Sequence, residues 1–100
     1  MHYLPNKTIW KFPLALEEEI VLKVPVGGIT RHFGLDPQSE FAVWIEVDRT
    51  ALRIDRKYAI VGTGHNLPNL YTYFGTLIEG KFVWHLYEFD YHAEQMRNGA

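Results

Sequence analysis

The short segment from Gly62 to Asn66 has the residue types of an anion-binding loop. Two glycines let a backbone approach a ligand closely, and main-chain N–H groups in such a turn can donate to an anion. Thr63 and His65 could add side-chain donors, and Arg31, elsewhere in the chain, could add a guanidinium. The sequence therefore predicts a ligand-binding site formed by Arg31, Thr63, Gly64 and His65.

The same segment also fits a strand that ends in a tight turn, for which glycine is a common residue. It lacks the lysine and the following serine or threonine of a P-loop. It also lacks the glycine spacing of a dinucleotide-binding fingerprint. At the level of the sequence, a ligand loop and a structural turn both stay open.

Three histidines, His32, His65 and His85, have the imidazole side chains that zinc binds in proteins. No two of them have a helical i, i+4 or other tight metal-ligand spacing, and the acidic residues give no further support. We therefore expect no metal site. A metal-dependent hydrolase that uses these histidines is the last of three functional hypotheses.

The residues needed for covalent catalysis are scarce. The chain has no cysteine, which excludes disulfides, thiolate zinc sites, iron–sulfur clusters and thiol nucleophiles. Its one serine, Ser39, lies in a Pro-Gln-Ser turn without the surroundings of a nucleophile elbow. Glu46, Glu88 and Asp90 could meet across strands, but carboxylates on strands usually face solvent. We therefore expect a protein that is not an enzyme and that needs no cofactor.

The C-terminal third of the chain contains more aromatic side chains than one face of a small sheet can easily bury. Tyrosine and tryptophan combine a large contact area with a polar group, which suits binding surfaces. An aromatic-rich core is the alternative explanation. If part of the set forms an interface, the candidates are Tyr71, Tyr73, Trp84, Tyr87 and Phe89.

Short runs rich in β-branched and aromatic residues recur at intervals of about ten residues, separated by turn residues. The alternation of apolar side chains is clearest in Phe41–Val47. These patterns predict a mainly antiparallel all-β fold, a small β-sandwich or barrel of about six or seven strands. The expected strands are Thr8–Phe12, Glu18–Val24, Ile29–Leu35, Phe41–Val47, Tyr58–Thr63, Tyr71–Ile78 and Lys81–Phe89.

Two segments depart from simple alternation. In Ile29–Leu35 the pattern places Arg31 on one face with Phe33 and other apolar neighbours. Asp48–Asp55 mixes both signs of charge, so we expect a solvated loop in which Ala51–Ile54 could make one helical turn.

The last two strands are predicted to form a hairpin through Glu79-Gly80, because glycine tolerates the positive φ of short turns. The second of them, Lys81–Phe89, is apolar on both faces, so we expect it to be central or covered on both sides. Its alternation places Trp84 in the core. After it we expect a short irregular or helical C-terminal tail over residues 90–100.

The composition fits a packed domain, since 47% of the 100 residues are apolar and 15% are aromatic. The net charge of −2 gives no field that would draw the chain to duplex nucleic acid. No apolar run reaches the roughly 18–20 residues of a membrane span or forms a signal peptide. We expect a single domain over residues 1–100, with a flexible start at residues 1–6, in the cytoplasm and without a membrane partner.

Three local patterns occur together and cover most of the chain. They are Thr8-Ile9-Trp10-Lys11-Phe12-Pro13-Leu14, then Ile60-Val61-Gly62-Thr63-Gly64-His65, then Gly75-Thr76-Leu77 followed through Gly80 by Phe82-Val83-Trp84-His85. This set resembles a family of small proteins of unknown function carried by phages and prophages. The resemblance implies an accessory protein in the cytoplasm of a host cell. Such proteins often bind a host component, including components of antiviral defence.

The leading functional hypothesis is stoichiometric, non-catalytic binding to a host protein, with counter-defence inhibition as one form of it. The alternative is a protein that sequesters a small anionic ligand or nucleotide signal at the predicted loop. Because the last strand is apolar on both faces, we also expect a homodimer or higher homo-oligomer, formed through the C-terminal hairpin.

Overall fold

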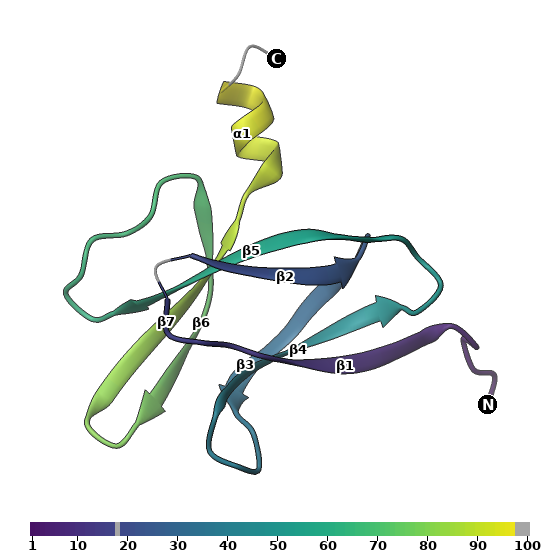
Figure 1. The fold of residues 1–100 in the computed structure, drawn as a ribbon, viewed down its shortest axis with the longest axis horizontal. Coiled ribbons are helices and arrows are strands. Elements are labelled where there is room, and N and C mark those ends of the chain that lie inside the picture. The colour runs from purple at the N-terminus through teal and green to yellow at the C-terminus, as the bar shows by residue number, and fades with distance from the viewer. Residues whose placement is uncertain (18, 98–100) are drawn as a thin grey trace. The chain divides into compact units, whose positions relative to one another are not determined.

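The computed structural model describes residues 1–17 and 19–97, which form seven strands and one helix (Figure 1). The prediction of a mainly antiparallel all-β fold with a short helical C-terminal segment is confirmed. Glu18 and residues 98–100, where the sequence predicts the start of a strand and the end of the tail, lie outside the described residues. The elements are β1 (Lys7–Pro13), β2 (Ile20–Pro25), β3 (Ile29–Leu35), β4 (Phe41–Asp48), β5 (Arg53–Gly62), β6 (Tyr71–Glu79), β7 (Phe82–Phe89) and α1 (Tyr91–Arg97).

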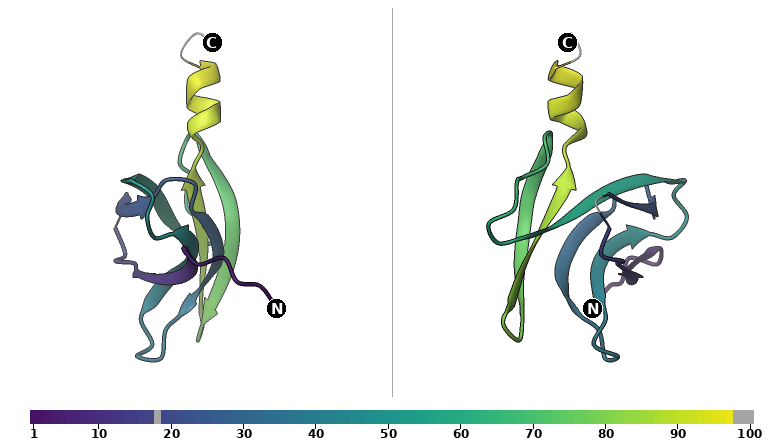
Figure 2. Two further views of the ribbon diagram at one scale, coloured as in Figure 1. Left: turned by 90° about the vertical axis from the view of Figure 1, so that its right-hand side faces the viewer. Right: turned by 60° about the vertical axis from the view of Figure 1, so that its left-hand side comes forward.

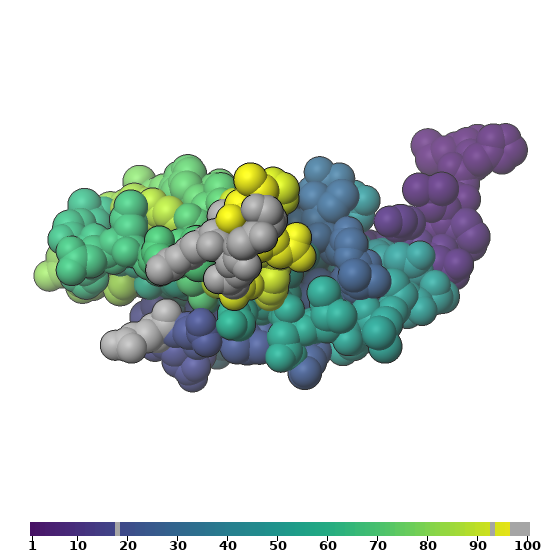
Figure 3. Space-filling model, turned by 90° about the horizontal axis from the view of Figure 1, so that it is seen from above, coloured from purple at the N-terminus to yellow at the C-terminus, as the bar shows by residue number. Residues whose placement is uncertain are grey.

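The strands form two sheets, with the hydrogen-bonded orders β1-β4-β3 and β2-β5-β7-β6. The chain also divides into two compact units, one of Met1–Ala15 with Val21–Arg56 and one of Leu16–Ile20 with Lys57–Ala100. Strand β5 begins in the first unit and ends in the second. The expectation of one domain stays a prediction. Residues 1–6 precede the first strand and are exposed (Figure 3).

Strand β4 is the centre of the first sheet and supplies much of the first unit's core. The apolar face predicted from its alternation is buried, and the side chains of Val43, Ile45 and Val47 are fully inaccessible. Ala42, on the opposite face, is also fully buried. Both neighbours of β4 run antiparallel to it, in a register that pairs Trp10 of β1 with Ile45.

A β-bulge in β3 changes which of its side chains face the core. The register with β4 shifts between Thr30 and His32, so Arg31 is an extra residue in the ladder. An extra residue turns the side chains that follow it to the other face. Thr30 and Phe33 are therefore both buried, whereas Arg31 is exposed. The expectation that Arg31 shares a face with Phe33 is wrong because the bulge interrupts the alternation.

The loop predicted at Asp48–Asp55 is shorter in the structure. Strand β4 extends to the first residue of that segment, and β5 already begins at Arg53, so Ala51–Ile54 forms no helical turn. Lys23 of β2 forms an ion pair with Asp55. Ion pairs between neighbouring strands stabilise their pairing modestly. Part of the charged segment that the sequence predicts as a loop therefore consists of outward-facing side chains of a strand.

In the second unit, β7 lies between β5 and β6 and is antiparallel to both, as its two apolar faces predict (Figure 2). On the face of β7 that carries Phe82, Trp84 and Leu86, burial decreases toward the start of the strand. Leu86 is fully buried, Trp84 is half-buried, and Phe82 at the start of the strand is 54% exposed.

The hairpin that joins β6 to β7 turns one residue later than predicted. Glu79 pairs with Phe82, so the two turn residues are Gly80 and Lys81, and Gly80 has a φ of 58°. Helix α1 follows β7 almost directly (Figure 1). No helix in the described part of the chain is long and apolar enough to cross a membrane.

Candidate functional site

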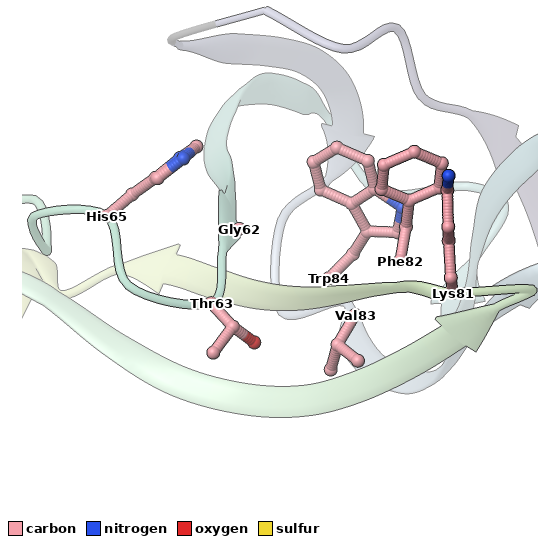
Figure 4. Close-up of a pocket in the computed structure, with 7 residues that line it drawn as sticks. All are labelled: Gly62, Thr63, His65, Lys81, Phe82, Val83 and Trp84. Carbon is pink, nitrogen blue, oxygen red and sulfur yellow. The ribbon is translucent and has the colours of Figure 1, made fainter.

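A pocket of about 470 Å³ lies in the second unit, where the end of β5 meets the start of β7 (Figure 4). The turn after β5 and the hairpin turn before β7 both contribute to it. The pocket therefore brings together two segments that are about twenty residues apart in the sequence. Its lining residues are Gly62, Thr63, His65, Lys81, Phe82, Val83 and Trp84.

One side of the pocket is an aromatic pair on β7. Phe82 and Trp84 are two residues apart in a strand, so their side chains share a face. Their rings are stacked, with centroids 6.1 Å apart and 26° between the planes. The ammonium of Lys81 lies 5.7 Å from the centre of the Phe82 ring. The pair thus offers an apolar platform with a positive charge at its rim.

The other side of the pocket is formed by His65 and Gly62. The N–H of His65 donates to the carbonyl of Gly62 at 3.1 Å, and Gly64 between them has a φ of 90°, which glycine adopts readily. In Figure 4 the imidazole of His65 and the ring of Trp84 extend to the same side of the sheet, with Gly62 between them. Because Gly62 has no side chain, the imidazole of His65 can lie directly against its backbone.

The N–H groups of this turn are partly engaged within the chain. The N–H of Thr63 donates to the carbonyl of Val83 at 3.3 Å, and that of His65 is bound by Gly62. The side chain of Thr63 points away from the pocket side (Figure 4). Among the residues that line the pocket, Lys81 and His65 have polar side chains that can donate to a ligand.

On the opposite face of the sheet, His85 is held between two threonine hydroxyls. Its Nε2 lies 2.8 Å from Oγ1 of Thr63, and its Nδ1 lies 2.8 Å from Oγ1 of Thr76. The hydroxyl of Tyr73 lies 2.5 Å from the same Thr76 oxygen. Both ring nitrogens of His85 are satisfied, which fixes the orientation of the ring. Since Thr63 and His65 belong to one turn, this network anchors the turn that lines the pocket.

Arg31, the fourth residue of the predicted ligand site, belongs to the first unit. Its Nη2 and Nε donate to Oε1 of Glu46 at 2.9 and 3.2 Å. The guanidinium charge is thus matched by a carboxylate on the neighbouring strand. The other three predicted residues, Thr63, Gly64 and His65, come together in the turn after β5.

The three histidines considered as metal ligands have separate surroundings. The ring of His32 packs on Trp44, with centroids 5.4 Å apart, in the first unit. His65 lies against Gly62, and His85 bridges two threonines. Across residues 1–17 and 19–97, no group of three or more His, Cys, Asp or Glu side chains could hold a metal ion.

The aromatic residues predicted at an interface divide between two faces of the hairpin. Tyr71 packs edge-on against Phe89, and Tyr73 packs edge-on against Tyr87, with centroids 5.3 and 5.6 Å apart. These four share a face because they form cross-strand pairs at alternate positions. Trp84 lies on the other face, in the pocket.

Sequence reasoning did not identify Lys81 and Phe82 as site residues. The sequence nevertheless contains patterns that could have identified both residues. A two-residue turn at Gly80 places Lys81 directly before the strand, and the i, i+2 spacing places Phe82 beside Trp84. What the sequence did not show is that the turn after β5 packs against this end of β7.

The model of a family described as a domain of unknown function, DUF7352, matches residues 5–96. That range includes all seven strands and every residue that lines the pocket. No curated protein and no solved structure matches the chain.

Proposed function

We propose that this chain, which belongs to the DUF7352 family of domains of unknown function, binds a small anionic ligand with a planar ring in the pocket beside Gly62. The leading class of ligand is a nucleotide. The observation that carries the proposal is the arrangement of a stacked aromatic pair, an ammonium and an imidazole around one pocket beside Gly62. This is the second of the two binding hypotheses drawn from the sequence. It keeps His65 as a donor and uses Lys81 in place of Arg31 and Thr63.

The chemistry of the pocket matches the two parts of a nucleotide. A planar base can stack on the aromatic platform of Phe82 and Trp84, and such stacking contributes about 1–3 kcal/mol per base. The phosphate can then approach Lys81, whose ammonium lies at the rim of the platform. His65 can donate from the opposite side. A volume of about 470 Å³ also lies within the usual range for small-molecule sites.

The test is a thermal-shift series with mononucleotides and cyclic nucleotides added to the full chain. A ligand at a hundredfold its dissociation constant stabilises the fold by about 2.7 kcal/mol, which a melting experiment on a small domain resolves easily. We expect at least one nucleotide to raise the melting temperature, and His65→Ala and Phe82→Ala to reduce the shift. If no nucleotide in the series stabilises the parent chain, the proposal fails.

Lys81 and Lys57 provide a matched pair of variants. Each ammonium lies near a phenylalanine ring, at 5.7 Å for Lys81 and 5.0 Å for Lys57, but only Lys81 lines the pocket. Lys81→Gln should weaken nucleotide binding, whereas Lys57→Gln should leave it unchanged. Arg31→Ala tests whether that arginine contributes to ligand binding, as the sequence predicts. Because Arg31 does not line the pocket, we expect this variant to bind nucleotide as the parent chain does.

Stoichiometric binding to a protein is the second candidate function, and the exposure of the hairpin favours it. Tyr73 and Phe82 are 52% and 54% exposed, and aromatic side chains of this kind are enriched at protein interfaces. A phage accessory role, such as inhibition of a host defence protein, is one form of this second candidate function. Affinity capture with the parent chain and with a Tyr73→Ala, Phe82→Ala variant tests it. A protein retained equally by both does not bind through the hairpin.

A further inference from the structure

Four strands lie at sheet edges in the two hydrogen-bonded orders: β1, β3, β2 and β6. An edge strand can pair with a strand of another chain, and native proteins limit this with charged residues, prolines, bulges or short strands. Three of the edges have such features. They are Lys7, Lys11 and Pro13 in β1, Lys23 and Pro25 in β2, and Arg31 at the bulge of β3.

Strand β6 lacks most of this protection. It is the longest of the four, with nine residues, and it contains no lysine, arginine or proline. Its own bulge lies between Tyr73 and Gly75, so the stretch Gly75–Glu79 is regular. Within that stretch the side chain of Ile78 is 69% exposed. This half of β6 therefore has the properties of an edge that accepts another strand.

The main-chain groups of this stretch have a defined direction. The carbonyl of Val83 accepts from Thr63, which places it on the β5 side of β7. The opposed pair of Ile78 and Val83 is therefore of the non-hydrogen-bonded kind. It follows that the N–H and C=O of Ile78 point away from β7, and by alternation those of Thr76 do the same.

We propose that β6 pairs with β6 of a second copy of this chain, antiparallel, about a two-fold axis at Leu77. This register places Thr76 opposite Ile78 of the second copy, so the outward main-chain groups of both residues are used. It places Glu79, the one charged residue of the strand, opposite Gly75 of the second copy. No carboxylate meets a carboxylate, and the same surface serves both copies, as a two-fold interface requires.

A single-cysteine variant tests the register, because the chain has no cysteine of its own. The two copies of residue 77 face each other as a non-hydrogen-bonded pair, in which Cβ atoms lie about 4.5–5.5 Å apart. That is close to the Cβ separation of about 3.5–4.5 Å in a disulfide. Under mild oxidation Leu77→Cys should form a covalent dimer, whereas Thr72→Cys, before the bulge, should not. Cross-linking of Thr72→Cys alone would overturn the proposed register.

Ile78→Lys tests the interface without relying on a disulfide. A lysine at an exposed edge position should oppose strand pairing and leave the fold intact. We expect the parent chain to sediment as a dimer at micromolar concentration and Ile78→Lys to raise the dissociation constant by about tenfold or more. The matched control is Val21→Lys, on the edge strand β2 and 48% exposed, which should remain dimeric. A monomeric parent chain, or a dimer unaffected by a folded Ile78→Lys variant, would overturn the proposal.

Discussion

The imidazole of His65 lies against the backbone of Gly62, and a Cβ atom at residue 62 would meet Cε1 and Nδ1 of the ring at 3.2 Å. This contact is tighter than ordinary van der Waals distance, so a side chain at residue 62 would displace the histidine. The absence of a side chain at Gly62 therefore allows the ring of His65 to lie where it lines the pocket.

We expect Gly62→Ala to reduce the nucleotide-dependent rise in melting temperature while the chain still folds. Gly62 is not among the glycines with a positive φ, so alanine fits its backbone, and the flexible end of the His65 side chain can move. Gly75→Ala is the matched control, because a Cβ there meets nothing within 4 Å. Equal nucleotide shifts in both variants would show that the space beside Gly62 is not the ligand site.

Two side chains on the same face of β7 should respond very differently to truncation. Leu86 is fully buried, so Leu86→Ala should lower the free energy of unfolding by about 2–5 kcal/mol. Phe82 is 54% exposed, so Phe82→Ala should lower it by about 1 kcal/mol or less. Urea denaturation of both variants measures this. Similar losses would show that the pocket end of β7 is packed as tightly as its centre.

The fold class could be predicted from the sequence because period-two alternation reports burial directly. Phe41–Val47 shows this most clearly, since every residue of its predicted apolar face is buried. Alternation no longer reports burial where a bulge changes the period of the strand. The bulge at Arg31 adds one residue to the ladder, and a single insertion reverses every later assignment in that strand.

The candidate site was harder to predict because its halves come from separate turns. Sequence reasoning identified Thr63 and His65, which lie in the turn after β5. It did not place Lys81 at the same pocket, because this placement depends on the β5–β7 register, which pairs Gly62 with Trp84. Local glycine patterns indicate a turn, but they do not indicate which strand the turn packs against.

Asp36 should make the stability of the chain depend on pH in acid solution. Its carboxylate accepts hydrogen bonds from the N–H groups of Glu40 and Gln38, and from the ammonium of Lys11 at 3.1 Å. The bond from Glu40 is the largest cause that lowers the pKa of Asp36 below its usual 3.8, and burial opposes the shift. A lowered pKa in the folded state means that the stabilisation is present above about pH 4 and is lost as the pH falls through the folded-state pKa.

The measurement is urea denaturation of the parent chain and of Asp36→Asn between neutral pH and pH values below the usual aspartate pKa. We expect the asparagine variant to be less stable at neutral pH and to lose less stability on acidification. Asp55→Asn is the control, because Asp55 is more exposed and pairs with Lys23 at the surface. Parallel pH profiles for the parent chain and Asp36→Asn would contradict this assignment.

Tyr71 should ionise later than an ordinary tyrosine. Burial is the main cause that raises the pKa of Tyr71 to about 12, and the hydrogen bond from its hydroxyl to Oε2 of Glu19, at 3.1 Å, adds to it. The folded state therefore favours the neutral phenol. The resulting stabilisation is complete below the ordinary pKa of 10.0 and is lost as the pH rises from there toward about 12.

The absorbance of tyrosinate, measured against pH while circular dichroism follows the fold, tests this. The parent chain has six tyrosines, and we expect the absorbance change near pH 12 to be smaller by one phenol in Tyr71→Phe. Tyr73→Phe removes a more exposed phenol from the same strand and should keep that late step. An absorbance change near pH 12 of the same size in Tyr71→Phe as in the parent chain would contradict the assignment to Tyr71.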